Sequence, residues 1–397
     1  MPRLIAFYLP QFHPIPENDA WWGRGFTEWT NVTRAKPLFP GHLQPQLPAD
    51  LGFYDLRVPE VRAGQADLAR GAGIEGFCYW HYWFGGRRIL ERPFNEVISS
   101  GEPDFPLCLG WANESWQGIW HGCERRLLIE QTFPGKADHE AHFYALLDAF
   151  HDRRYLRVRG KPIFVIFRPN NLPNPEGFLE LWQNLARENG LAGIHFVAHL
   201  FDNEENYPFR SIGYEGAVMT SALKVVNHRI WHVAAKHAAG FRNSKGPMQK
   251  LERALQGSKS MIRVISRRVA QRIMNWPGSV HDYADARMFF DPERAVANEM
   301  YPSVVPRWDN SPRAGKKGVV LHASTPELFE QHFREVLSSV AHRSTEDNIV
   351  FVKSWNEWAE GNYLEPDQKF GHGYLHAMKS ALEATPSIQP AWDTSPA

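Results

Sequence analysis

The sequence predicts a single α/β domain, a (β/α)8 TIM-type barrel spanning residues 1–397. Eight short apolar runs recur along the chain, and most are continuously apolar, as expected for parallel strands covered on both faces. Amphipathic helical segments separate them, which is the order of a barrel built from β/α units. The predicted strands are residues 4–9, 74–80, 107–111, 163–167, 194–199, 217–220, 303–308 and 349–354.

The intervening helices are recognised by their periodicity and by their ends. Pro59 lies near a predicted helix start, and Gly71 and Gly190 lie at predicted helix ends. A doubly wound sheet is the alternative fold, but it usually has a glycine-rich first turn, whereas PQFHP follows the first strand at residues 10–14. The barrel is therefore favoured. The predicted helices lie near residues 58–71, 138–152, 177–189, 325–340 and 373–384.

The most informative motif is SWNEWAEG at residues 354–361, directly after the eighth predicted strand. Glu357 and Glu360 lie three residues apart between tryptophans, and carboxyl groups supply the acid, base or nucleophile of glycosidic chemistry. A solvated strand end is the alternative, but indole rings crowding two carboxylates are costly unless something binds there. Glu357 and Glu360 are therefore the candidate catalytic residues.

Polar and aromatic residues also gather where the other predicted strands end. In a barrel, the carboxyl ends of the strands form the functional rim, so we expect these residues to surround one site. Hydrogen-bonding groups and aromatic rings together suit a sugar, although a packed loop or a core position is the alternative for each residue alone. The candidate substrate-binding residues are Tyr8, Gln11, His13, Trp80, His81, Tyr82, Trp111, Asn113, Glu114, Trp116, Arg168, His199, Arg307, Trp308, Asn356 and Trp358.

Two segments depart from the barrel pattern. Residues 13–50 form a loop-rich insertion after the first strand, and residues 221–300 form a long insertion between strands six and seven. Residues 221–280 contain twelve lysines and arginines but one acidic residue, Glu252, with apolar residues at helical spacing. We expect 221–300 to be a basic helical cap, either packed on the barrel or in peripheral contact with a membrane, an anionic polymer or a lipid-linked glycan.

The composition excludes several classes of protein. Forty-four basic and 44 acidic residues balance, with a pI near 7.3, which gives no support for a nucleic-acid partner. The three cysteines and the scattered histidines have no metal-type spacing, so no metal or cofactor is expected. No signal peptide or 18-residue apolar segment is visible, which favours a cytoplasmic location, with a periplasmic or exported protein as the alternative. The oligomeric state stays open.

Four motifs resemble the WbsX-type proteins of bacterial polysaccharide (O-antigen) gene clusters. They are AFYLPQFHPIPEN at 6–18, WGRGFTEWTNV at 22–32, GWANESW at 110–116 and WNEWAEG at 355–361. Proteins of this type are often labelled glycosyltransferases, yet they are similar to the endo-α-mannosidases of glycoside hydrolase family 99, which are (β/α)8 barrels. The resemblance covers both ends of the chain and is weakest over 221–300.

This resemblance implies a retaining α-mannoside or α-rhamnoside hydrolase, because its route through a 1,2-anhydro sugar needs a 2-hydroxyl trans to the leaving group. Glu357 would deprotonate that hydroxyl, and Glu360 would protonate the leaving oxygen and later activate water. Since an acid must hold its proton near neutral pH, we expect a raised pKa for Glu360. The sequence leaves an exchange of the two roles open.

Two other functions stay open at this point. A glycosyltransferase or transglycosylase of polysaccharide assembly is one, although the sequence contains no Asp-x-Asp triplet and no glycine-rich loop after the first strand. A glycan-binding protein without catalysis is the other. Oligosaccharide or polysaccharide is the expected partner under every alternative.

Overall fold

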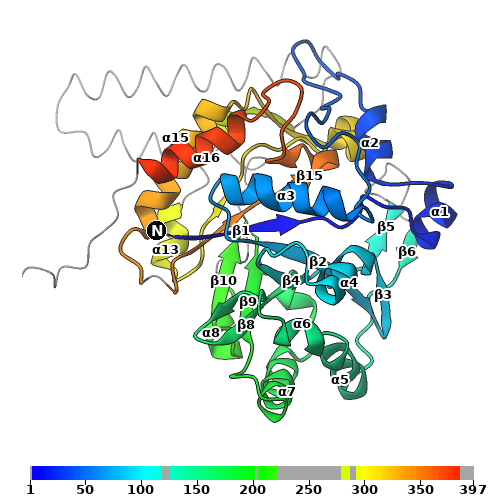
Figure 1. Ribbon diagram of the computed structural model, residues 1–397, viewed down its shortest axis with the longest axis vertical. Coiled ribbons are helices and arrows are strands. Elements are labelled where there is room, and N and C mark those ends of the chain that lie inside the picture. The colour runs from blue at the N-terminus through cyan, green and yellow to red at the C-terminus, as the bar shows by residue number, and fades with distance from the viewer. Residues whose placement is uncertain are drawn as a thin grey trace, which may run out of the picture.

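The computed structural model describes residues 2–118, 126–201, 204, 206–220, 279–286, 292–344 and 346–384. Within these residues, eight parallel strands form a nearly closed barrel with helices around it (Figure 1). This confirms the predicted (β/α)8 fold. The barrel strands are β1 (Arg3–Tyr8), β2 (Gly76–Phe84), β4 (Leu107–Trp111), β8 (Lys161–Ile166), β9 (His195–Leu200), β10 (Gly216–Met219), β12 (Ser303–Val304) and β14 (Ile349–Val352).

The first and last strands of the chain are neighbours in the wall of the barrel. Strand β1 lies between β2 and β14, with Leu4 in register with Val350 and Phe7 with Cys78. On the opposite side, a parallel bridge joins Val218 of β10 to Tyr301, just before β12, and brings the two edges of the sheet together. These strands are almost fully buried, which is why their sequences are apolar on both faces.

Helices cover the outside of the barrel, and three of the long ones begin at a proline. Pro59, Pro175 and Pro326 each occupy the first turn of a long helix, where the missing amide hydrogen costs nothing. Helix α15 packs on α16, and α5 packs on α7. The principal helices are α3 (Pro59–Gly71), α4 (Arg92–Ser100), α5 (Lys136–Tyr144), α6 (Leu147–His151), α7 (Pro175–Glu188), α8 (Phe209–Ile212), α13 (Pro292–Ala297), α15 (Pro326–Val340) and α16 (Gly373–Glu383).

Three predicted elements differ from the structure. The seventh strand, predicted over 303–308, is limited to β12 (Ser303–Val304). Strand β2 continues to Phe84 because it leaves the barrel and pairs with β3 (Arg87–Ile89) in a hairpin. The helix predicted over 138–152 is divided into α5 and α6 at Leu146, a buried residue whose backbone leaves the regular helical path. Phe143 and Phe150, one on each helix, are both buried in the core.

The insertion after β1 contains two short helices, α1 (Pro16–Trp22) and α2 (Glu28–Arg34), in the segment that the sequence predicts as loop-rich. Of the predicted cap at 221–300, residues 221–278 and 287–291 lie outside the described residues. The described part has β11 (Ser279–Asp282), paired in parallel with β13 (Val319–His322), and α12 (Tyr283–Ala286).

Most of the remaining short elements lie at the carboxyl ends of the strands, whereas β7 pairs with the start of β8. In Figure 1, β1 points towards the side of the molecule that carries α1, α2 and the β5–β6 hairpin. The remaining elements are β5 (Trp116–Gln117), β6 (Leu127–Ile129), β7 (Arg157–Val158), α14 (Ser311–Ala314), β15 (Asn356–Glu357), β16 (Asn362–Tyr363) and three 3-10 turns at Pro169–Asn171, Gly315–Lys317 and Trp358–Glu360.

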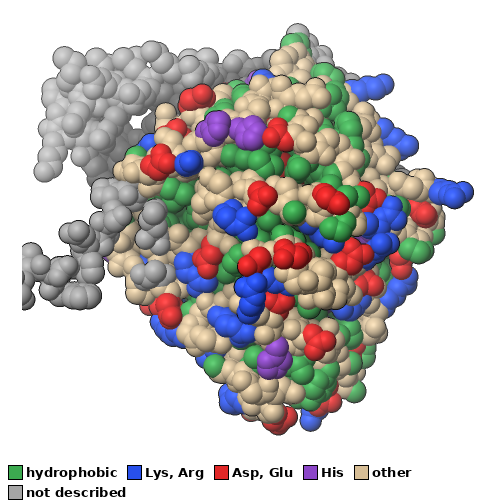
Figure 2. Space-filling model, in the orientation of Figure 1, with side chains coloured by type: hydrophobic (Ala, Val, Ile, Leu, Met, Phe, Trp, Pro, Cys, Tyr) green, Lys and Arg blue, Asp and Glu red, His purple; other side chains and the backbone are tan. Residues whose placement is uncertain are grey.

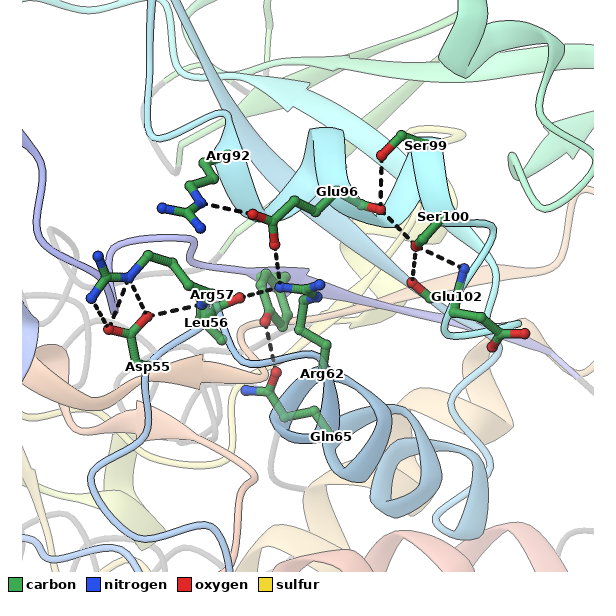
Figure 3. A network of polar contacts seen from close by, with 11 residues as sticks. Asp55, Leu56, Arg57, Arg62, Gln65, Arg92, Glu96, Ser99, Ser100 and Glu102 are labelled. Carbon is green, nitrogen blue, oxygen red and sulfur yellow. Dashed lines mark hydrogen bonds and ion pairs between the residues drawn. The ribbon is translucent and has the colours of Figure 1, made fainter.

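A buried arginine fixes helix α3 to its surroundings (Figure 3). One nitrogen of Arg62, Nη1, donates to the carbonyl oxygen of Leu56 at 2.5 Å and lies 2.9 Å from Oε2 of Glu96 on α4. Gln65, one turn further along α3, accepts a hydrogen bond from the Tyr8 hydroxyl at 2.7 Å. These contacts hold Gln65 under the loop that follows β14.

Acidic and basic side chains are interspersed over the described surface in Figure 2, in keeping with the balanced charge of the chain. In the described part of the chain, no helix is both long and apolar enough to cross a membrane.

Candidate active site

A cavity of about 180 Å³ lies at the carboxyl ends of the barrel strands. Its apolar part is built by Phe7, Leu9, Trp80 and Phe167, with the rings of Phe7 and Trp80 stacked at a centroid distance of 4.8 Å. Its polar part contains carboxyl, amide, imidazole and cationic groups. The predicted site residues that line the cavity are Gln11, Trp80, Tyr82, Glu114, Trp116, His199, Glu357 and Glu360.

The loop carrying the two glutamates is held to β1 by Asn356. The amide oxygen of Asn356 accepts from the amide of Leu9 at 2.7 Å, and its amide nitrogen donates to the carbonyl of Leu9 at 3.0 Å. Strands β15 and β16 form a small hairpin around the 3-10 turn that bears Glu360. The loop is therefore a fixed part of the barrel rim.

Gly361 ends this turn with a φ of +55°, in the left-handed region. A Cβ at this position would lie 2.8–3.0 Å from atoms of Asp309. The backbone amide of Asp309 donates to the carbonyl of Glu360 at 2.7 Å, so the loop after β14 is packed directly on the segment after β12. Only glycine allows that close approach.

The half-buried Glu357 and the buried Glu360 form a carboxyl pair joined by a hydrogen bond. Burial and the charge of Glu360 raise the pKa of Glu357 well above its usual value. Burial also disfavours ionisation of Glu360, but the Arg313 guanidinium and the hydrogen bond from Glu357 outweigh it and lower the pKa of Glu360. These opposite effects separate the pKa values of the two carboxyls, so a proton held by the pair lies on Glu357 in the substrate-free molecule.

The lowered pKa of Glu360 is the opposite of what the sequence predicts. The sequence predicts a raised pKa for Glu360, but Nη1 of Arg313 lies 2.7 Å from Oε1 of Glu360 and stabilises the ionised form. Arg313 comes from α14, 47 residues earlier in the chain. Local sequence therefore could not reveal this contact.

Four predicted binding residues have structural partners and lie outside the cavity. The Tyr8 hydroxyl bonds Gln65 on the outside of β1, and His81 bonds His142 between their Nε2 atoms at 2.8 Å. Asn113 exchanges hydrogen bonds with the backbone of Arg168, and Asn356 does so with the backbone of Leu9. Their polar groups are used within the fold.

The remaining predicted residues also lie outside the cavity. Trp111 and Trp358 are core residues with 1% exposure, and His13 is equally buried, which lowers its pKa to about 4. Arg168 lies 3.0 Å from the carboxylate of Glu114 and over the ring of Phe201. Residues Arg307 and Trp308 line a second, smaller cavity of about 70 Å³ on the other side of Gly361.

The sequence matches the family described as "Glycosyltransferase WbsX" over residues 4–378. The chain belongs to the WbsX family. In two strains of Xanthomonas campestris, B100 and ATCC 33913, a relative described as "Uncharacterized protein WxcX" is 38% identical over 389 residues. The alignment covers 97% of this chain and 50% of the relative, so this WbsX-family chain spans about half the length of the curated relatives it matches.

Solved structures share the WbsX-family fold seen here. A "Glycoside hydrolase-like protein" has a TM-score of 0.55 at 12% identity, covering 96% of this chain and 93% of its own. The GH99 endo-alpha-mannosidase from Bacteroides thetaiotaomicron has a TM-score of 0.54 at 13% identity, covering 96% of both chains. At this level of identity the likeness concerns the fold, and function has to be argued from the site.

Several cavity residues of this WbsX-family chain are absent from the predicted set, and the polar ones are Asn18, Glu28, Gln117, Arg313, Lys353 and Ser354. Glu28 lies inside one of the motifs that carry the family resemblance, so its motif was a usable signal. Arg313 and Lys353 could have been sought by a charge argument, because buried carboxyl groups require nearby cations. Among the described residues, no group of three or more His, Cys, Asp or Glu side chains is placed to hold a metal ion.

Beneath the loop that carries Glu357 and Glu360, the buried carboxylate of Glu365 is surrounded by hydrogen-bond donors. Oε2 accepts from the Trp358 indole at 2.6 Å and the Tyr54 hydroxyl at 2.9 Å, and Oε1 accepts from Gln65 at 2.6 Å. Burial nevertheless raises the pKa of Glu365 to about 7, because these hydrogen bonds only partly offset the loss of water. The carboxyl therefore connects α3, the insertion after β1 and the loop that carries Glu357 and Glu360.

Glu365 is expected to make stability depend on pH. Between about pH 4.5 and 7 the folded state keeps a proton that the unfolded state has released, so the contribution of this residue to the free energy of unfolding falls by about 1.4 kcal/mol per pH unit as pH rises. Urea unfolding at pH 5, 6 and 7 should show this slope in wild type relative to Glu365→Gln, which cannot ionise. Glu60→Gln, an exposed position on α3, is the control. Parallel curves for wild type and Glu365→Gln would contradict the prediction.

Proposed function

We propose that this chain is a retaining glycoside hydrolase that cleaves internal α-mannoside-like or α-rhamnoside linkages in a bacterial polysaccharide. The observation that carries the proposal is the pair of Glu357 and Glu360, which lines a cavity at the barrel rim and in which the pKa of one carboxyl is raised and that of the other is lowered. Glycoside cleavage needs one protonated and one ionised carboxyl on the same sugar. The aromatic part of the cavity suits the C–H face of a pyranose, and WbsX-family membership is in keeping with a polysaccharide substrate.

In the proposed first step, the ionised Glu357 takes the proton of the sugar 2-hydroxyl. The 2-oxygen then attacks C1, the bond from C1 to the leaving oxygen breaks, and that oxygen takes the proton of Glu360. In the second step, water attacks C1 and gives its proton to Glu360, while the 2-oxygen leaves C1 and recovers its proton from Glu357. Two displacements at C1 retain the configuration.

The substrate-free pair differs from this reactive arrangement by the position of one proton. Transfer of that proton from Glu357 to Glu360, across the hydrogen bond that joins them, gives the base and acid that the mechanism needs. A sugar hydroxyl that donates to Glu357 favours the transfer, because it stabilises the ionised carboxylate.

The test is incubation of purified protein with α-mannans and α-rhamnans, followed by measurement of new reducing ends. We expect new reducing ends on at least one of these polymers, and proton NMR during the first minutes should show the α-anomer as the initial product. Absence of cleavage across a broad panel of both polymers, or a β-anomer as first product, would contradict the proposal.

A second candidate is sugar transfer during polysaccharide assembly, which the description of the WbsX family as glycosyltransferases favours. The same anhydro sugar would then be opened by an acceptor hydroxyl in place of water. Adding an acceptor oligosaccharide and looking for a longer product distinguishes transfer from hydrolysis. Calorimetric binding of a nucleotide-sugar would instead indicate a donor-dependent glycosyltransferase, and glycan binding without turnover by wild type would indicate a binding protein.

A further inference from the structure

Arg313 lies between two buried carboxylates that come from opposite ends of the chain. Its Nη1 lies 2.7 Å from Oε1 of Glu360, and its Nη2 lies 3.0 Å from Oε2 of Glu28. Its Nε donates to the same oxygen of Glu28 at 3.1 Å. The guanidinium therefore makes a two-pronged contact with Glu28 and directs its remaining prong at Glu360.

The surroundings hold this arrangement rigidly. The side chain of Glu28 is 1% exposed and that of Arg313 is 12% exposed, so water does not screen the contact. Helix α2, which begins at Glu28, packs on both α14 and the 3-10 turn that bears Glu360. Glu28 has no place in the proposed chemistry, and a buried carboxylate is costly without a purpose in the fold or the site.

The charges around the cavity balance when one proton is present. Glu28, Glu357 and Glu360 are three carboxyl groups, and Arg313 and Lys353 are two cations, so one proton makes these five groups neutral together. The other ionisable groups that line the cavity are the Tyr82 hydroxyl, the neutral His199 and Glu114, whose carboxylate is paired with Arg168 outside the cavity.

We propose that Arg313, oriented by Glu28, is a positioning residue that keeps one of the two carboxyls of the Glu357/Glu360 pair ionised at neutral pH and the other protonated. The inference rests on the proposed function for its catalytic meaning. It concerns an ionisation state, so it can be measured without substrate. Arg313 acts through Glu360, and Glu28 acts through Arg313.

Removing the charge of Arg313 and removing that of Glu28 should shift the ionisation steps of the glutamate pair in opposite directions. Without the guanidinium, ionisation of the pair becomes harder, so Arg313→Gln is expected to raise both ionisation steps of the pair by about 1–3 pH units. Without the Glu28 charge, the guanidinium acts on the pair unopposed, so Glu28→Gln is expected to lower both steps. Arg313→Lys keeps the charge but loses the two-pronged contact and should give an intermediate shift.

The measurement is carbon-13 NMR of protein labelled at the glutamate side-chain carboxyl carbon, titrated without substrate, with Glu357→Gln and Glu360→Gln used to assign the two signals. Arg57→Gln, which removes an arginine paired with Asp55 outside the cavity, is the control and should leave both signals unchanged. If Arg313→Gln does not fold, the downward shift in the isosteric Glu28→Gln still tests the proposal. Titration of the pair at the wild-type pH in folded Arg313→Gln, or no downward shift in Glu28→Gln, would overturn it.

Activity separates this inference from the proposed function. If the protein cleaves α-glycans, both limbs of the pH profile of kcat/KM should move with the NMR titration in each variant. If the NMR shifts occur but wild type cleaves nothing, the proposed function fails and the role of Arg313 stands. If wild type cleaves glycans but Arg313→Gln leaves the titration unchanged, the role of Arg313 fails alone.

Discussion

Glutamine at position 357 or 360 is expected to lower kcat/KM on a polymeric α-mannoside or α-rhamnoside by about 10²–10⁴-fold, the usual contribution of a general acid or base. Glutamine keeps the shape of the side chain, but it can neither accept nor release a proton at these positions. The barrel rim should stay intact, because Asn356 and Glu365, which hold the loop, are unchanged. Far-UV circular dichroism and the unfolding midpoint of each variant are the controls for folding.

A substrate with an activated leaving group should separate the two roles. A nitrophenolate needs no protonation, so Glu360→Gln should recover most of its first-step rate on a nitrophenyl α-glycoside. Glu357→Gln should remain slow on both substrates, because the 2-hydroxyl still has to lose its proton. The opposite pattern would mean that Glu360 is the base and Glu357 the acid. The proton would then stay on Glu357, as in the substrate-free protein. Undiminished turnover by both variants would refute the proposed chemistry.

Replacement of Arg307 by methionine is expected to reduce the free energy of unfolding by about 3–5 kcal/mol, because it leaves a buried carboxylate without its cation. Nη1 of Arg307 lies 2.7 Å from Oδ2 of Asp367, and both side chains are at most 5% exposed. The rings of Tyr363 and Tyr374 lie 3.9 and 4.4 Å from its guanidinium carbon, which adds cation–π attraction.

Urea unfolding of Arg307→Met, Asp367→Asn and the double variant measures this contact as a double-mutant cycle. The double variant should lose less stability than the sum of the single variants, since neither charge is then left alone. The sequence predicts Arg307 as a substrate contact, and this experiment also tests that prediction. If Arg307→Met has wild-type stability and a raised KM, Arg307 contacts the substrate as the sequence predicts.

The barrel was predictable because its signals are local. Each strand is a short apolar run, and the helix starts are marked by Pro59, Pro175 and Pro326. The glutamate pair was predictable for the same reason, since both residues lie in one eight-residue motif after a strand. Cavity residues on or just after the first two strands, such as Trp80 and Gln11, follow from the rule that barrel sites form at the carboxyl ends of strands.

The rest of the site depends on which way a side chain points, and alternation along a strand decides that. Trp80 enters the barrel, whereas His81, one residue later, faces outward and meets His142. The sequence gives no reason to prefer one of these two neighbours. The state of the glutamate pair depends on Arg313 and Glu28, which become neighbours only when α2 and α14 pack together, so their effect on the pair cannot be read from either segment alone.

The position of β1 between β2 and β14 has a consequence for folding during synthesis. Leu4 can pair with Val350 only after almost the whole described chain has left the ribosome, so barrel closure is a contact of very high sequence separation and a late event. Glu28, Arg313 and Glu357 are brought together in that same final step. A chain that has not finished closing would thus have these groups far apart, and we expect the cavity at the barrel rim to form with the last strand and not before it.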